Sequence, residues 1–331
     1  MKYKIYILTF FITLISCSEN SSATITEQNQ EIPSVKKEET YDVIVTKDIV
    51  YAEGLSHTTI NGTTTSTKQL KLDAYVPNNS DKNRPAIVLI HGGGFSSGSK
   101  EVGSMVYLAN YFAARGWVAF SINYRLEADL GTVPDAWVPF AQNNLDPSLV
   151  DQFFALYPAS RDAKAAIRWL YANASNYNIN TDYITVGGGS AGAVTATMLG
   201  ATNAEDYTEE ISLEKDPTLA TTNLDQPTKV HTVLDFWGSG ITVEILDDLY
   251  NRQRFDTTDA PIIIMHGTED LIVSFSDAEK LKNNYENSGV PFEFYPLEGK
   301  GHSVWNATVN GKRLEVLSFD FIVEQQKLKI E

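Results

Sequence analysis

The chain alternates short apolar runs with stretches of helical periodicity over most of its length. Continuous apolar runs at residues 86–90 and 118–124 are typical of strands that are buried on both faces of a sheet. Residues 102–115 and 161–174 carry apolar positions at helical spacing. Strands that alternate with helices favour a mostly parallel sheet with helices on both faces. We therefore predict an α/β fold.

Further elements are expected on both sides of this central part. Residues 42–51 and 69–76 alternate apolar and polar positions, and the Asn61-Gly62 pair between them indicates an antiparallel hairpin. The remaining expected elements are strands at residues 183–186, 230–236, 261–265 and 291–295, and helices at residues 193–199, 276–288 and 310–328. The predicted sheet thus has eight strands.

Two long segments do not follow the alternation. Residues 127–160 are rich in aromatic residues, and residues 201–228 are acidic and polar. Long excursions near strand ends are where α/β proteins place binding loops. We expect residues 127–160 to form a loop or lid insertion; simple packing of a loop onto the surface is the alternative.

The N-terminus has the pattern of an export signal. Lys2 and Lys4 precede an apolar run at residues 5–15, which is shorter than the roughly 20 residues that a membrane-spanning helix needs. The sequence Leu-Ile-Ser-Cys that ends at Cys17 resembles the lipobox of bacterial lipoproteins. The resemblance implies a signal peptide at residues 1–16 and an exported protein whose lipid-modified Cys17 anchors it to a membrane, with the outer membrane or cell surface expected. An ordinary secreted protein with a chance cysteine is the alternative.

The composition of the chain indicates the bounds of the folded domain and argues against some classes of partner and site. Residues 17–40 are polar and lack apolar periodicity, so we expect a disordered tether there and one folded domain at residues 41–331. The net charge of −16 argues against a nucleic-acid partner, because phosphate binding needs a basic face. Cys17 is the only cysteine in the sequence, so neither an intramolecular disulfide nor a cysteine-type zinc site can form. Nothing in the sequence indicates a metal or an organic cofactor.

Candidate chemistry centres on Gly-Gly-Ser-Ala-Gly at residues 188–192, which matches G-x-S-x-G. A serine on a sharp strand-to-helix turn has a strained backbone, and small neighbours let the strand and the helix approach closely. The motif alone often arises by chance. Its position between a predicted strand and a predicted helix favours Ser190 as a nucleophile.

A serine nucleophile needs a base and a carboxylate that orients the base. Of the three histidines after Ser190, His302 lies in a Gly-rich loop between the last predicted strand and the last helix, where an imidazole can reach the sheet edge. His231 and His266 adjoin strands and are expected to be structural. We therefore predict His302 as the base, and we expect any reaction that uses Ser190 to slow at acid pH because the base must be neutral.

The expected acid and the oxyanion donors also follow strands. Asp270 closes the turn after residues 261–265, with Glu269 beside it as a rival. A second glycine run, which includes Gly93 and Gly94, follows the buried strand at residues 86–90, and glycines there let backbone N–H groups turn inward. We expect the oxyanion donors to be the N–H groups of Gly93, Gly94 and Ala191. A phosphate-binding loop is disfavoured because no Lys-Ser or Lys-Thr pair completes it.

In this order the motifs resemble the α/β-hydrolase esterases that have a His-Gly-Gly-Gly oxyanion motif. Residues 86–95 are similar to hormone-sensitive-lipase-like enzymes and type B carboxylesterases, whereas residues 188–192 and 266–270 are similar to small acetyl and feruloyl xylan esterase-like proteins. The resemblance implies an α/β-hydrolase fold and ester hydrolysis through an acyl-enzyme, with a Ser190, Asp270 and His302 triad.

The resemblance leaves the substrate open between short-chain acyl esters and acetyl or feruloyl esters of polysaccharides. Large aromatic residues near the motifs are expected to line the pocket, namely Phe95, Trp137, Trp237 and Trp305, with Phe140, Phe153 and Tyr157 as further candidates. Two other classes stay open. One is a non-catalytic surface lipoprotein of the same fold that binds a partner or carbohydrate. The other is an exopeptidase similar to prolyl oligopeptidase, although residues 41–85 leave no room for the large N-terminal domain of that group.

Overall fold

The structure is a computed structural model that describes residues 31–331. The expected signal peptide, Cys17 and the first part of the expected tether lie outside the described residues, so export and lipidation stay predictions from the sequence. None of the described helices combines the length and the hydrophobicity needed to cross a bilayer.

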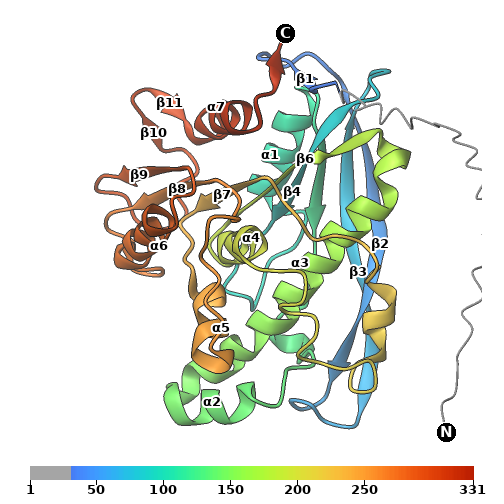
Figure 1. The fold of residues 1–331 in the computed structure, drawn as a ribbon, viewed down its shortest axis with the longest axis vertical. Helices are drawn as coiled ribbons and strands as arrows, with labels where there is room; N and C mark the ends of the chain where they lie inside the picture. The colour runs from blue at the N-terminus through green and yellow to red at the C-terminus, as the bar shows by residue number, and fades with distance from the viewer. Residues whose placement is uncertain (1–30) are drawn as a thin grey trace, which may run out of the picture. The chain divides into compact units, whose positions relative to one another are not determined.

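An eight-stranded sheet forms the middle layer of the described domain (Figure 1). Its strands, in spatial order, are β2 (Val43–His57), β3 (Thr65–Pro77), β5 (Val118–Ile122), β4 (Arg84–Ile90), β6 (Ile179–Gly189), β7 (Thr232–Phe236), β8 (Ile262–Gly267) and β9 (Phe292–Leu297). β3 runs antiparallel to both of its neighbours, and the strands from β5 to β9 are parallel. The predicted eight-stranded, mostly parallel sheet is confirmed.

Helices cover both faces of this sheet, as Figure 1 shows. They are α1 (Gly103–Ala113), α2 (Trp137–Asn144), α3 (Val150–Tyr177), α4 (Ala191–Ala201), α5 (Ile241–Tyr250), α6 (Phe275–Ser288) and α7 (Leu314–Gln326). Successive residues of β4 face different cores: Val88 packs in the core under α3 and α4, and Ile87 packs in the core under α1 and α7. A strand with a core on each side must be apolar at every position, which explains its uninterrupted apolar run.

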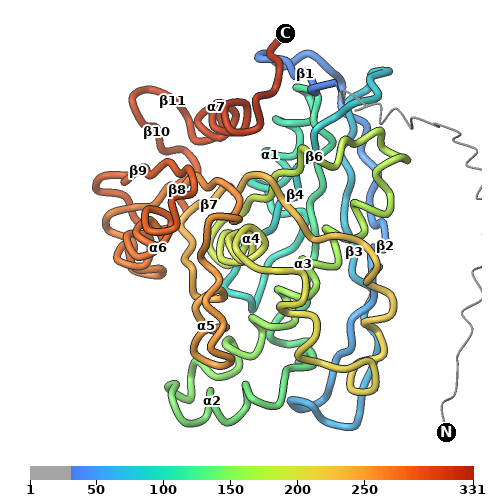
Figure 2. The backbone as a smooth tube through the Cα atoms, viewed as in Figure 1, coloured from blue at the N-terminus to red at the C-terminus, as the bar shows by residue number. Residues whose placement is uncertain are grey.

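The predicted helix at residues 161–174 is longer than expected. α3 already begins at Val150, inside the segment predicted as an insertion, and it contains Pro158. The aromatic residues of its first half are buried on several sides, so they hide the helical period. In Figure 2 the backbone of α3 starts next to α2 and continues to the neighbourhood of β6. Residues 201–228, the other irregular segment, reach the edge of the sheet, where Thr221 accepts a hydrogen bond from the Glu53 amide.

The end of the predicted tether belongs to the folded domain. β1 (Ser34–Val35) pairs in parallel with β12 (Lys329–Ile330), near the C-terminus. Val35 is buried, and Lys36 forms an ion pair with Glu331 at 2.9 Å. The prediction of disorder up to residue 40 is therefore wrong for this part of the chain, because a two-residue pairing is too short to produce a periodic pattern.

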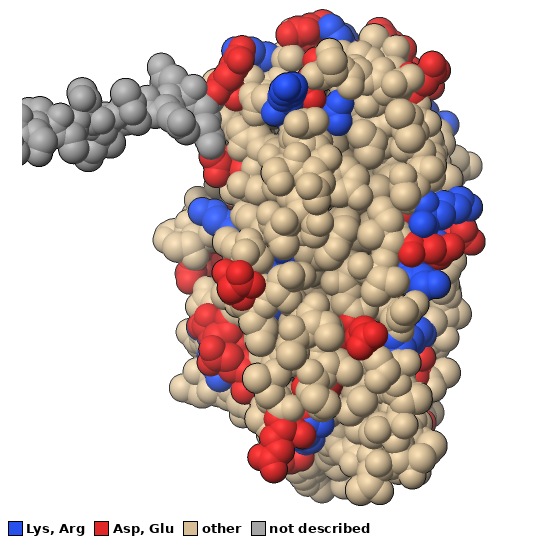
Figure 3. Space-filling model, turned by 90° about the vertical axis from the view of Figure 1, so that its right-hand side faces the viewer, with Lys and Arg blue, Asp and Glu red and all other residues tan. Residues whose placement is uncertain are grey.

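Charged side chains are mixed on the face that contains the β2 edge. In Figure 3, Lys and Arg side chains lie in separate groups, several of them next to Asp or Glu. Ion pairs that start from β2 and β3 include Lys47 with Glu101 and Lys68 with Asp129. This face therefore lacks the continuous basic surface that nucleic-acid binding requires.

Candidate active site

Ser190 occupies the sharp turn between β6 and α4. Its backbone has φ 56° and ψ −123°, a conformation that costs a non-glycine residue about 1–3 kcal/mol. A hydrogen bond from the Ser190 amide to the Phe236 carbonyl, at 2.9 Å, helps to hold the turn. A Cβ atom at Gly188 would lie 2.4 Å from the Ile90 carbonyl oxygen, and one at Gly192 would lie 2.0 Å from the same oxygen. The two glycines are thus needed for β6 and α4 to pack against β4.

The structure brings the three predicted catalytic residues into one hydrogen-bonded row. Ser190 Oγ lies 2.9 Å from His302 Nε2, and His302 Nδ1 lies 2.7 Å from Asp270 Oδ2. The other carboxylate oxygen of Asp270 accepts the amides of Ile272 and Val273, at 2.8 and 3.1 Å. Asp270 is buried and its rival Glu269 is exposed, so Asp270 is the carboxylate that meets the imidazole.

A second histidine touches the same carboxylate. His266 is fully buried, and its Nε2 lies 3.0 Å from the Val273 carbonyl and 3.3 Å from Asp270 Oδ2. The sequence pattern places His266 at a strand end and predicts a structural role. The contact with Asp270 depends on how residues 270–273 fold back over β8, which no local pattern reveals.

The loop after β4 lies beside the turn that carries Ser190. A Cβ at Gly92 would lie 2.6 Å from the Gly189 carbonyl oxygen, and Gly93 and Gly94 have φ angles of 109° and 61°. Among the described residues, no acceptor takes a hydrogen bond from the N–H groups of Gly93, Gly94 or Ala191. The Gly94 carbonyl accepts a hydrogen bond of 2.9 Å from the side-chain amide of Gln152, at the start of α3. Gln152 is a contact that the sequence analysis missed.

Two other histidines, one buried and one half-buried, are held by contacts within the domain. His91 stacks on Tyr124 with ring centroids 4.3 Å apart, and His231 accepts a hydrogen bond from the Ile184 amide at 3.2 Å. Burial lowers the pKa of each from 6.5 to about 4, and nearby Lys229 also lowers that of His231. The unfolded chain therefore binds protons between about pH 6.5 and pH 4 that the folded protein does not bind. The free energy of unfolding consequently falls as the pH decreases through this range.

We expect His231→Asn to reduce this acid sensitivity. An asparagine side chain retains an acceptor for the Ile184 amide but takes up no proton. Between about pH 7.5 and pH 5, the variant should lose about 2 kcal/mol less unfolding free energy than the wild type. Urea unfolding at the two pH values measures this difference. Equal losses in both proteins would contradict the linkage to His231.

A cavity of about 580 Å³ opens next to Ser190. Most of its wall is apolar, from the loop after β4, α2, α3, α5 and the loop after Asp270: Phe95, Phe140, Leu145, Leu149, Phe153, Leu156, Ile241, Ile245, Ile272 and Val273. Charged residues also line it, namely Glu244, Asp248, Asp277 and Lys280. The segment predicted as an insertion, residues 127–160, therefore supplies one wall of this cavity.

The predicted pocket residues divide into two groups. Phe95 lines the cavity beside Ser190, but Trp137 and Trp237 are 0% and 1% exposed and belong to the cores. Trp137 packs against Phe153, and Trp237 packs against Trp305 with ring centroids 4.6 Å apart. Trp305 lines a different cavity. The prediction is therefore wrong for Trp137 and Trp237, because large indole rings are buried most easily in the core, and wrong for Trp305, because its ring lines the other cavity.

Comparison with known proteins finds a family model and several esterases that resemble the chain. The model of the BD-FAE family matches residues 72–136 and 140–251, more than half of the chain. Esterase LipC of Mycobacterium tuberculosis is 23% identical over 240 residues, which cover 67% of this chain and 53% of LipC. Carboxylesterase 1C of Rattus norvegicus is 30% identical over 159 residues, 47% of this chain and 26% of that protein. The chain thus spans about half the length, or less, of these curated relatives.

Solved structures agree on the fold. A propionate-bound esterase 2 of Thermogutta terrifontis has a TM-score of 0.57 at 22% identity, over 81% of this chain and 94% of that chain. A truncated carbohydrate esterase from gut microbiota has a TM-score of 0.59 at 20% identity, over 88% and 99% of the two chains. At these identities the likeness shows the fold alone, the α/β-hydrolase fold that the sequence motifs imply.

Proposed function

The chain belongs to the BD-FAE family, and from this membership and the geometry around Ser190 we propose that it is a serine carboxylic-ester hydrolase. The observation that carries the proposal is the row from Ser190 through His302 to Asp270, with contacts of 2.9 and 2.7 Å. A serine, a base within hydrogen-bond reach and a third group that orients the base are the signature of an activated nucleophile. The esterase relatives favour this reading over a binding protein or a peptidase.

In the proposed mechanism, Ser190 Oγ attacks the acyl carbon and His302 Nε2 takes the hydroxyl proton. The carboxylate of Asp270 accepts a hydrogen bond from the Nδ1–H group of His302, which holds the imidazole in the required tautomer and stabilises the imidazolium. The proton then passes from Nε2 to the leaving alcohol, and an acyl-enzyme remains. His302 next takes a proton from water, whose oxygen attacks the acyl carbon. The bond between the acyl carbon and Ser190 Oγ then breaks, His302 returns the proton to Oγ, and the carboxylic acid leaves.

The tetrahedral intermediates carry negative charge on the former carbonyl oxygen. We propose that the N–H groups of Gly93, Gly94 and Ala191 stabilise this charge. Their lack of acceptors among the described residues supports this role, as does the position of Ala191 at the N-terminus of α4. Donors that are already fixed in place need no rearrangement when the charge develops.

We propose that the substrates are short-chain acyl esters or acetyl or feruloyl esters of polysaccharides. The largely apolar cavity of about 580 Å³ beside Ser190 suits an acyl group better than a charged one. The Thermogutta esterase was solved with propionate bound, and another structural neighbour is described as a carbohydrate esterase. Both descriptions agree with this substrate class.

A panel of esters tests the proposal. p-Nitrophenyl esters of increasing acyl length, acetylated xylan and methyl ferulate should be compared with a peptide p-nitroanilide. We expect ester hydrolysis with a preference for the shorter acyl chains, and no turnover of the anilide. Folded protein without activity on any ester would refute the proposal and favour a binding protein, whereas preferred cleavage of the anilide would favour a peptidase.

A further inference from the structure

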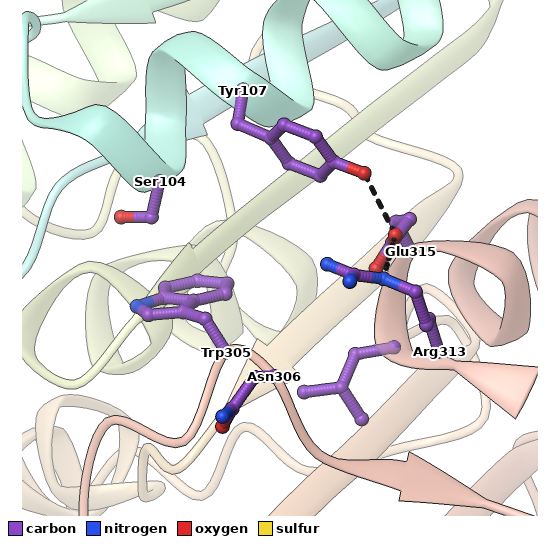
Figure 4. Close-up of a pocket in the computed structure, with 7 residues that line it drawn as sticks. Ser104, Tyr107, Trp305, Asn306, Arg313 and Glu315 are labelled. Atoms are coloured by element: carbon purple, nitrogen blue, oxygen red, sulfur yellow. Dashed lines mark hydrogen bonds and ion pairs between the residues drawn. The ribbon is translucent and has the colours of Figure 1, made fainter.

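A second cavity lies outside the cleft at Ser190. It has a volume of about 280 Å³ and shares no lining residue with the larger cavity. α1 supplies Ser104 and Tyr107, and the segment that leads from the His302 loop into α7 supplies Trp305, Asn306, Arg313 and Glu315 (Figure 4). The volume lies just below the range of about 300–1,000 Å³ that is usual for small-molecule sites, so we expect a ligand about one ring in size.

The polar groups of this cavity are held in place by a buried carboxylate. Glu315 is 4% exposed and accepts hydrogen bonds from the Tyr107 hydroxyl at 2.8 Å and from Arg313 Nε at 2.5 Å. Figure 4 shows both side chains meeting at Glu315. The Arg313 guanidinium is thus fixed through Nε, and in the described part of the chain nothing accepts from its two terminal nitrogens. Fixed donors of this kind bind a ligand with little loss of conformational entropy.

Aromatic rings form much of the remaining wall. Tyr107 is 48% exposed, and Trp305 stands across the cavity from it (Figure 4). Aromatic rings offer a flat apolar surface, while the side chains of Asn306 and Ser104 offer donors and acceptors at the edge. The ligand that fits has a flat apolar face and a rim of hydroxyl groups, which is the chemistry of a pyranose ring.

The charges of the cavity wall and of the whole chain favour a neutral ligand. Arg313 and Glu315 compensate each other, so the cavity walls bring no net charge. The whole chain carries −16, and a field of this sign repels anions from the surface. We propose that this cavity is a binding site for one neutral sugar unit of a saccharide. The inference concerns binding alone, so it stands or falls independently of the proposed ester hydrolysis.

Trp305 lines the proposed sugar site and also contacts the turn that carries Ser190. A Cβ at Gly189, the residue before Ser190, would lie 2.7 Å from Trp305 Cζ2. Trp305 also packs against Trp237, whose ring centroid lies 6.3 Å from that of His302. One indole therefore separates the proposed sugar site from the turn that carries Ser190, and its fluorescence should report occupancy.

Calorimetric titration of the full chain with xylotetraose, which contains no ester, tests the site. We expect a Kd of about 1 mM or below, accompanied by a change in tryptophan fluorescence. Arg313→Gln and Asn306→Ala should each weaken binding by about fivefold or more, because each removes a donor to a hydroxyl group. Lys312→Ala, which removes a neighbouring exposed cation outside the cavity, is the matched control and should bind like the wild type.

Three results would overturn the proposal. The first is no binding at concentrations about tenfold above the expected Kd. The second is binding that both cavity variants leave unchanged while their melting temperatures match the wild type, which would place the sugar elsewhere. The third is tighter binding of glucuronate than of methyl β-xyloside, which would replace a neutral ligand by an anionic one.

Discussion

Ser190→Ala should lower kcat for p-nitrophenyl acetate by about 10⁵- to 10⁶-fold, with little change in KM. The substitution removes only the hydroxyl oxygen that lies 2.9 Å from His302 Nε2. Alanine meets the same backbone demand at φ 56°, so the turn between β6 and α4 should persist. The lost rate then measures the missing nucleophile and not a rearranged site.

Ser239→Ala is the matched control for this experiment. Ser239 is buried and lines the same cavity, but its hydroxyl is not part of the row with His302 and Asp270. Its removal should change kcat by less than about tenfold. Steady-state kinetics on freshly purified variants, with circular dichroism to verify folding, give both numbers. If Ser190→Ala retained more than about a tenth of the wild-type kcat, hydrolysis would have to use another nucleophile.

Gly192→Ala should destabilise the domain by more than about 3 kcal/mol, or prevent soluble expression. The added Cβ would lie 2.0 Å from the Ile90 carbonyl oxygen and 2.7 Å from the Ile90 carbonyl carbon. Both atoms belong to the backbone of β4, which is hydrogen-bonded to strands on both sides. Neither α4 nor β4 can move away without breaking the sheet or the turn at Ser190.

Gly103→Ala provides the comparison. Gly103 is the first residue of α1, and a Cβ there would have no atom within 4 Å. Alanine should leave stability unchanged or raise it by up to about 1 kcal/mol, because glycine loses more conformational entropy on folding. Urea unfolding of both variants and the wild type gives the two free energies. A Gly192→Ala protein as stable as the wild type would mean that α4 and β4 are further apart than described.

The sheet could be predicted because each parallel strand has a hydrophobic pattern that is recognisable in the sequence. Strands such as β4 are apolar on both faces, and helices such as α1 and α6 have one apolar side, so the sequence separates them. The start of α3 was not predictable, because Pro158 and buried aromatic residues conceal the helical period. The β1 pairing was missed because its register depends on residues near the opposite end of the chain.

The candidate site also has one part that the sequence predicts and another part that it does not. Ser190, Asp270 and His302 each follow a strand, and the carboxyl ends of parallel strands meet at one edge of the sheet, so sequence order was enough to bring them together. The direction of an aromatic side chain is not encoded in this way. Trp137 and Phe140 lie on the same short helix, yet the first points into the core and the second lines the cavity.

α3 contacts the loop after β4 and also lines the cavity beside Ser190, and this affects how mutation can change the substrate range. Gln152 holds the Gly94 carbonyl, and its next neighbour Phe153 and nearby Leu156 line the cavity beside Ser190. Substitutions on this helix that enlarge the cavity will therefore also shift the loop expected to hold the oxyanion, and turnover will change together with selectivity. α5 offers Ile241 and Ile245 on another wall. A library directed at α5 should consequently yield variants with altered acyl preference and preserved rate more often than one directed at α3.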